Sequence, residues 1–187
     1  MIDESHADAE LLRQAASGDA RASRDLVTRH LGAVVAFAWR LLGERAAAED
    51  VAQETFLRLW RHAARWEPRA RLRTWLMRVA HNLCIDRLRA RREDVLTEAD
   101  EPEDPAPGAD ALRQQRQVAA SVTAALAALP ARQRAAIALV HFDELSVKEA
   151  AAIMEISIEA LESLLARARR RLHELLTPER DQLMGKI

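Results

Sequence analysis

The sequence predicts an all-α protein in which two small helical domains are joined by an acidic flexible linker. Apolar residues recur at the spacing of a helix face through most of the 187 residues. Glycine is scarce (5 residues) and tyrosine is absent, while good helix formers such as Ala, Leu, Arg and Glu dominate. Residues 93–110 differ, because they hold eight acids, no base and no apolar periodicity. We therefore expect a bundle of about four helices over 1–92, a linker over 93–111 and a four-helix domain over 112–187.

Charge and composition narrow the class of protein. The net charge of −1 hides a division into +5 for residues 1–92, −8 for 93–110 and +2 for 111–187. With 49% hydrophobic and 30% charged residues, the chain reads as a soluble, core-forming protein. Its single cysteine, Cys84, excludes an internal disulfide and a CxxC metal site. No apolar run approaches about 18 residues, so we expect a cytoplasmic protein that does not insert into a membrane by itself.

The first two helices are delimited by turn and capping residues. One is predicted from Ala7 to Ser17, before Gly18, and Asp19 can cap a second that ends at Leu42. His30 and Trp39 are interpreted as structural. The apolar positions that recur in these two helices are Leu11, Leu12 and Ala15, then Leu26, Val27, Leu31, Val34, Val35, Ala38 and Leu42.

A third helix, predicted from Glu49, has two specialised faces. Its core face holds Val51, Ala52, Thr55, Phe56, Leu59 and Ala63. The opposite face holds Asp50, Gln53, Glu54, Leu57 and Trp60. Large apolar groups beside acids and an amide suit a docking surface, because interface cores favour aromatic anchors. The alternative is that Trp60 packs against a neighbouring helix of the same domain.

A fourth helix is predicted from Arg71 to Arg92. Its core stripe is Leu72, Trp75, Leu76, Val79 and Leu83. A different side presents Arg71, Arg78, Asn82, Arg89 and Arg92, which suit phosphates and base edges. The alternative for these arginines is an ordinary solvated face. Trp75 borders them and could stack on a base, although core packing is the favoured interpretation.

Residues 112–187, which we call the second block, are predicted to form four helices that include a helix-turn-helix motif. One helix from Ala111 ends before Pro130, and another spans Arg132 to Phe142. Ser146 and Glu149 form a capping-box pattern that opens a helix through Met154. After a turn at Glu155 and Ile156, Ser157 can cap a last helix to about Leu176. The second helix of such a motif enters the major groove, and the candidate contacts on it are Ser157, Glu159, Ala160, Ser163, Arg167, Arg170 and Arg171.

Residues 1–92, which we call the first block, contain motifs that resemble those of a known protein family. The run Asp50-Val-Ala-Gln53-Glu54-Thr-Phe56-Leu-Arg-Leu-Trp60, followed by Thr74-Trp75-Leu76 and Asn82…Asp86, resembles the promoter-opening domain of extracytoplasmic-function (ECF) sigma factors of bacterial RNA polymerase. The resemblance implies that Asp50, Gln53, Glu54 and Trp60 bind the β′ clamp helices of the polymerase, and we add Leu57 from the same helix face to the expected polymerase contacts. The resemblance also implies that Trp66 to Thr74, with Asn82, hold a flipped-out base of the −10 element. The expected −10 contacts are Arg69, Arg71, Thr74, Trp75, Arg78, Asn82, Arg89 and Arg92.

The second block is similar to the −35-reading domain of the same group through LPARQR…LSVKEAAAIMEIS…RARRRL. It departs from that pattern at Glu155, where the family often has Gly in the turn, and at Glu159, where Gly or Ala is usual. Glu162 and Leu164 replace residues that are commonly basic. These departures leave room for a protein-binding role. The resemblance also implies that the acidic linker passes through the polymerase channel. Alternatively, the acids of the linker could shield the arginines of the first block.

The sequence favours one function over two alternatives. The favoured one is an ECF-type sigma factor that directs polymerase to promoters, with core RNA polymerase (β′ clamp helices and β flap), promoter DNA and an anti-sigma protein as its partners. The second is a sigma mimic that sequesters an anti-sigma protein without opening DNA, and the third is an ordinary helix-turn-helix regulator. No phosphate-binding loop, metal-ligand cluster or nucleophile–base pair is apparent, so we expect neither a cofactor nor catalysis.

Overall fold

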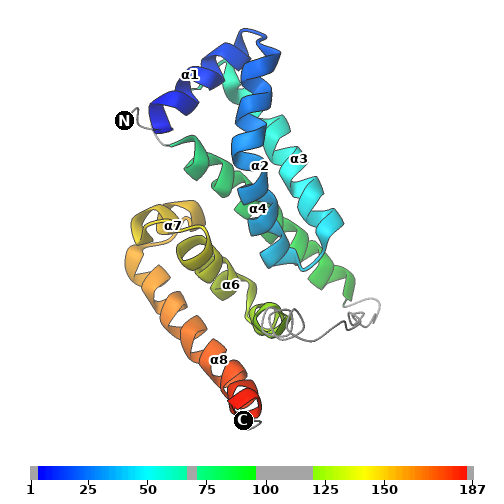
Figure 1. Ribbon diagram of the computed structural model, residues 1–187, viewed down its shortest axis with the longest axis vertical. Coiled ribbons are helices and arrows are strands. Elements are labelled where there is room, and N and C mark those ends of the chain that lie inside the picture. The colour runs from blue at the N-terminus through cyan, green and yellow to red at the C-terminus, as the bar shows by residue number, and fades with distance from the viewer. Residues whose placement is uncertain (1–3, 67–70, 96–119, 185–187) are drawn as a thin grey trace.

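The computed structural model describes residues 4–66, 71–95 and 120–184, and within these ranges it contains helices and no strand. The first half consists of α1 (Glu4–Ala16), α2 (Ala20–Leu42), α3 (Arg45–Ala63) and α4 (Leu72–Val95). The second half has a helical segment over 120–127, then α6 (Ala131–Ile137), η1 (Ala138–Phe142), α7 (Val147–Met154) and α8 (Ile158–Met184). The predicted all-α fold class is therefore confirmed (Figure 1).

Capping residues set the limits of α2 as the sequence predicts. The side chain of Asp19 accepts hydrogen bonds from the backbone N–H groups of Arg21 (2.7 Å) and Ala22 (3.2 Å). At the other end, Gly43 adopts a left-handed conformation (φ 73°) and its N–H donates to the carbonyl of Trp39 at 2.8 Å. Glycine adopts this conformation without the steric cost that a Cβ would bring.

Helix α3 begins at Arg45 rather than at the predicted Glu49. The added turn is rich in alanine, the best helix former, and it buries Ala47 and Ala48 against the core. The predicted core face of this helix is confirmed, since the side chains that it assigned to the interior are all buried: Val51, Ala52, Thr55, Phe56, Leu59 and Ala63.

Helix α4 buries a different set of residues from the predicted stripe. Leu72 and Leu76 are buried as expected, but so are Met77, Ala80 and Cys84. The predicted core residues Trp75, Val79 and Leu83 are only half-buried. The reason is that α4 packs against α2 and α3 on one side and against α6 and α7 of the second half on another (Figure 1). It also continues to Val95, past the predicted start of the linker, whose residues from 96 onward lie outside the described part of the chain.

The second half confirms the helix-turn-helix and corrects one helix. The helix predicted over Arg132–Phe142 is α-helical only to Ile137 and then π-helical, and the N–H of Asp143 donates to the carbonyl of Ala138 (3.0 Å). The capping box is formed in both directions: the Ser146 hydroxyl accepts from the N–H of Glu149, and the Glu149 carboxylate accepts from the N–H of Ser146. The hydroxyl of Ser157 accepts from the N–H of Ala160 at 3.2 Å, as expected for the cap of α8.

The two halves share one hydrophobic core. Buried residues of the first half such as Leu41 and Met77 belong to the same cluster as Leu139, Ile153 and Leu161 of the second half. Helix α4 packs against α7, and α2 packs against α6 and η1. In Figure 1 the second half lies along α4 and the lower end of α2, while the end of α8 extends away from the first half. The sequence alone does not predict this closed arrangement.

Candidate functional site

The predicted docking surface lies on the solvent side of α3. We use this name for Asp50, Gln53, Glu54, Leu57 and Trp60. Leu57 is 41% exposed, and Asp50 and Gln53 are also exposed. Glu54 is half-exposed and accepts a hydrogen bond from Nε of Arg58 at 2.8 Å. Trp60 is half-buried with its ring centroid 6.2 Å from that of Phe56, so it both packs within the domain and borders the surface.

A groove beside the docking surface adds residues of α2 that the sequence analysis did not assign to it. The groove has a volume of about 760 Å³ and is lined by Leu31, Val35 and Trp39 of α2 together with Glu49 and Gln53 of α3. Leu31 is 39% exposed although it belongs to the predicted apolar stripe of this helix, and Trp39 is 45% exposed, so both present apolar surface to solvent. The signal was present in the sequence, because these three residues follow one another at intervals of four and form a second apolar stripe.

The arginine face of α4 is exposed at most of its predicted positions. Arg71, Arg78, Asn82 and Arg89 are exposed, and Thr74 is half-buried. Arg69 lies outside the described residues, and the side chain of Arg92 is likewise not described. Arg78 donates from Nε to Oε1 of Glu155 at 3.0 Å, and Nη1 of Arg71 lies 3.9 Å from Oε1 of Glu149. Two of the predicted DNA contacts thus meet carboxylates of the second half.

Three aromatic side chains cluster at the start of α4. The Trp75 ring stacks on His62 with centroids 5.8 Å apart and planes 6° from parallel. Trp66 meets Trp75 edge-on, with centroids 5.7 Å apart and an interplanar angle of 84°. This packing supports the structural interpretation of Trp75. The cluster joins the end of α3 to the start of α4.

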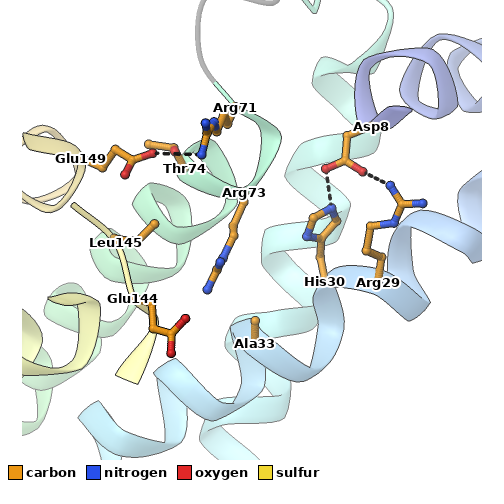
Figure 2. A pocket seen from close by; sticks show the side chains of 10 residues that line it. All are labelled: Asp8, Arg29, His30, Ala33, Arg71, Arg73, Thr74, Glu144, Leu145 and Glu149. Atoms are coloured by element: carbon orange, nitrogen blue, oxygen red, sulfur yellow. Dashed lines mark hydrogen bonds and ion pairs between the residues drawn. The ribbon is translucent and has the colours of Figure 1, made fainter. Parts of the chain in front are cut away.

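A polar cavity of about 490 Å³ lies between α1, α2, α4 and the segment before α7 (Figure 2). Asp8 is 5% exposed, and its carboxylate lies 2.9 Å from Nε2 of His30 and accepts from Nη1 of Arg29 at 2.5 Å. Burial alone would raise the pKa of Asp8, but His30 and Arg29 together hold it below its ordinary value. The structural interpretation of His30 is therefore supported. Asp8 belongs to no recognisable sequence motif, so its pairing with His30 could not be predicted.

The outer side of α8 presents the residues predicted to read DNA. All of them are exposed: Ser157, Glu159, Ala160, Ser163, Arg167, Arg170 and Arg171. The core side is buried as expected through Leu161, Leu165 and Ala168. Two of these arginines form hydrogen bonds within α8. Nη1 of Arg171 donates to Oε2 of Glu174 at 3.1 Å, and Nη2 of Arg167 donates to the hydroxyl of Ser163.

The described residues offer no group of three or more His, Cys, Asp or Glu side chains that could hold a metal ion. Among the same residues, no helix combines the length and the apolar character that crossing a membrane requires. His81 is 7% exposed, and burial is the main reason that its pKa lies below the ordinary value.

Each half of the chain matches a known protein family. Residues 26–93 match the family model for Sigma-70 region 2, and residues 119–172 match that for Sigma-70 region 4. The chain is 33% identical to the ECF RNA polymerase sigma factor SigM of Mycobacterium tuberculosis, over 90% of this chain and 84% of SigM. This chain belongs to the ECF sigma factors. Sigma factors are transcription initiation factors rather than enzymes.

Two other sigma factors match this chain over most of their length and share its fold. The sigma factor CnrH of Cupriavidus metallidurans is 33% identical over 94% of this chain and 97% of CnrH. The structure of CnrH in complex with the cytosolic domain of CnrY superposes with a TM-score of 0.70, covering 92% of this chain and 98% of CnrH at 31% identity. RpoE from Bartonella quintana, in complex with the anti-sigma factor NepR, gives a TM-score of 0.68 at 30% identity over 82% and 96% of the chains.

Proposed function

We propose that this ECF sigma factor binds core RNA polymerase through the docking surface and its adjoining groove, and directs the enzyme to promoters by contacting −10 DNA with α4 and −35 DNA with α8. The observation that carries the proposal is a set of exposed apolar side chains within the region 2 match: Leu31 and Trp39 line the groove, and Leu57 lies one helical turn beyond Gln53, which also lines it. Clusters of exposed large apolar groups mark interaction sites on proteins. The third function, a regulator that uses only the second half, leaves this patch unexplained.

The chemistry of the patch suits a helical partner with basic side chains. Leu31, Trp39 and Leu57 supply apolar contact, while Glu49 and Asp50 place negative charge around it. Asp50 forms an ion pair with Arg87, whose Nη2 lies 3.6 Å from Oδ2 of Asp50. We assign the β′ clamp helices of the polymerase as the occupant. Apolar anchors then contribute most of the affinity, and the acids set the register and orientation of the bound helix.

The start of α4 supplies what a separated DNA strand requires. Arg71, Arg78 and Arg89 offer positive charge for phosphates, and Asn82 offers a donor and an acceptor for a base edge. Promoter opening takes a base out of the stack, which costs a few kcal/mol. The aromatic cluster of His62, Trp66 and Trp75 provides a wall between the end of α3 and the start of α4, and we place the pocket for that base against this wall.

The second half contributes duplex recognition and a second attachment to the enzyme. The start of α8 faces solvent, so it can enter a major groove, where Glu159 can accept a hydrogen bond from cytosine N4. Arg167, Arg170 and Arg171 lie further along the helix, in positions suited to phosphates. We also propose that this half contacts the β flap. Two attachments to one polymerase increase the effective concentration of each DNA-reading helix.

We further propose that the protein acts in the cytoplasm and is controlled by an anti-sigma protein. Support comes from RpoE, whose structure was solved with an anti-sigma factor. The exposed apolar groove beside α3 is a suitable target, because an inhibitor bound there competes directly with the polymerase. The exposed acids Glu159 and Glu162 on α8 also leave room for the sigma-mimic function.

In vitro transcription with core polymerase from the native host and a promoter library tests the proposal. The protein should confer specific initiation, and Leu57→Arg should weaken polymerase binding at least about 10-fold by placing a charge in the interface core. Ser17→Arg, an exposed position in the turn between α1 and α2, is the matched control and should leave binding unchanged.

Three results would contradict parts of this proposal. Equal polymerase binding by Leu57→Arg and Ser17→Arg would refute the docking surface. Binding of an anti-sigma protein without any initiation would support the sigma mimic. Binding to duplex DNA without polymerase, at affinities typical of specific regulators, would support the helix-turn-helix regulator.

A further inference from the structure

The outer side of α8 is open to a ligand near the start of the helix. The helix packs against α6 and α7, and in Figure 1 it forms the edge of the second half that lies away from α2 and α4. Leu161 and Leu165 are buried on its core side, whereas Glu162, Ser163 and Ala166 are exposed. These exposed side chains lie in the part of a recognition helix that meets base edges in the major groove.

Glu162 is an exposed acid that forms no ion pair or hydrogen bond with any other part of the described chain. Residues three and four positions apart are neighbours on a helix surface, and an arginine there would pair with it. Glu174, further along α8, has such a partner in Arg171. The corresponding neighbours of Glu162 carry no positive charge: Ile158, Glu159, Leu165 and Ala166. The carboxylate of Glu162 is therefore available to accept hydrogen bonds from a ligand.

Glu159, the other acid at the start of α8, has a different environment. Hydrogen bonds from its own backbone N–H and from the side chain of Ser157 hold the pKa of its carboxyl below the ordinary value. Both donors belong to the beginning of the helix, where backbone N–H groups lack partners within the helix. Glu159 thus serves the end of the helix itself, whereas Glu162 has no such role.

The chemistry of a carboxylate restricts which base Glu162 can contact. An ionised carboxylate only accepts hydrogen bonds, so it requires a base edge that offers a donor. In the major groove these donors are the amino groups of cytosine and adenine. The adenine amino group lies between two acceptors, N7 of adenine and O4 of the paired thymine, and both repel a carboxylate. The cytosine amino group has an acceptor, O6 of the paired guanine, on one side only, so cytosine fits Glu162 best.

We propose that Glu162 is a specificity-determining residue of α8, and that its carboxylate accepts a hydrogen bond from the amino group of a cytosine in the −35 element. The inference rests on the proposed function of α8. Ala166 lies one turn further on and has no side chain beyond Cβ, so a base edge can approach Glu162 closely. Arg167, Arg170 and Arg171 attract the phosphates and offset the repulsion that one carboxylate adds.

In vitro transcription with core polymerase from the native host and promoters randomised across the −35 region tests this assignment. The unsubstituted protein should favour cytosine at one position by about 5- to 100-fold, since a single mismatched base pair changes affinity by about this much. Glu162→Gln should remove the preference for cytosine and favour adenine there, because a carboxamide pairs with N6 and N7 of adenine. Preferences at the other −35 positions should remain unchanged.

Two other acids serve as comparisons in the same assay. Glu144→Gln removes an equal charge from an exposed position before α7 and should leave all base preferences unchanged. Glu159→Gln should keep the preference for cytosine, because that carboxylate is bound to the start of the helix. Loss of the cytosine preference in Glu159→Gln but not in Glu162→Gln would overturn the assignment. Stronger initiation from every −35 sequence by Glu162→Gln, with the cytosine preference kept, would also overturn it, since it would show only repulsion of phosphates.

Arg170→Ala separates failure of this inference from failure of the proposed function. Arg170 is exposed on the same side of α8, and its loss should weaken initiation from all −35 sequences, because a phosphate contact carries no base preference. If −35 preferences exist but none of them changes in Glu162→Gln, the inference alone is refuted. If the unsubstituted protein shows no −35 preference and Arg170→Ala has no effect, α8 does not read promoter DNA, and the proposed role of α8 fails together with the inference.

Discussion

Asp143 shows how one side chain at the contact between the halves makes stability depend on pH. It is 4% exposed, and burial raises its pKa to about 6 despite the positive charges of Arg40 from α2 and Arg73 from α4. The nearer oxygen of Asp143 is 3.7 Å from Nη1 of Arg40, and the Arg40 guanidinium lies 4.6 Å from the centre of the Phe142 ring. The carboxylate is therefore more costly to ionise in the folded protein than in the unfolded chain.

The sign of the effect follows from proton linkage. The folded protein binds the proton of Asp143 more tightly than the unfolded chain, so the free energy of unfolding falls as pH rises from about 4 to about 6. Asp143→Asn removes the ionisable group, and should stabilise the protein at pH 7 by about 1–3 kcal/mol. Urea unfolding between pH 4.5 and 7.5 checks this, with the exposed Asp25→Asn as the control. A variant no more stable than the unsubstituted protein at pH 7 would contradict it.

The sequence correctly predicts the roles of residues whose hydrogen-bond partners lie only a few positions away in the chain. Asp19, Gly43 and the Ser146–Glu149 capping box follow local rules, and the structure confirms all of them. The pairing of Asp8 with His30 and that of Arg78 with Glu155 join residues far apart in the chain. No spacing rule reaches across such a separation, so these pairs emerge only once the helices are packed.

At the scale of an element, the N-terminal cap of α2 supports a helix that contacts both halves. The helix packs against α1, α3, α4, α6 and η1, so its position influences both halves. Asp19→Ala leaves two N–H groups of its first turn without their side-chain acceptor and should cost about 1 kcal/mol, or roughly 0.5–2 kcal/mol across known helix caps. Asp19→Asn keeps an acceptor and should cost clearly less. Equal losses for the two variants in urea unfolding would show that charge, and not the cap, is responsible.

Helix α4 shows why an apolar stripe predicts burial incompletely. The stripe through Leu72 and Leu76 is correct, but Met77, Ala80 and Cys84 are buried as well because a second layer of helices covers them. A sequence pattern indicates which residues can be buried, not how many neighbours a helix will have. The opposite error occurs in α2, where Leu31 belongs to the predicted apolar stripe yet is 39% exposed.

The whole molecule brings the two predicted helical halves together in one closed arrangement. The sequence predicts the helices of each half and the faces assigned to polymerase and DNA. Most described residues of these faces are exposed, whereas Glu54, Trp60, Thr74 and Trp75 are half-buried. The sequence does not predict that both halves contribute to one core. The closed arrangement depends on the sum of many contacts between distant segments, which local periodicity does not encode.

The shared core predicts that the two halves unfold together. All four tryptophans (Trp39, Trp60, Trp66 and Trp75) lie in the first half, so their fluorescence reports on that half alone. A fluorescent label at Ala166→Cys on α8 reports on the second half. Met77 is fully buried on α4, and Met77→Ala should cost about 2–5 kcal/mol by leaving a cavity. Because the core is continuous, the urea midpoints seen by tryptophan and by the label should coincide and shift together in this variant. If the label's midpoint stays unchanged while that of tryptophan falls, the halves unfold independently, and their contact is too weak to hold the closed arrangement.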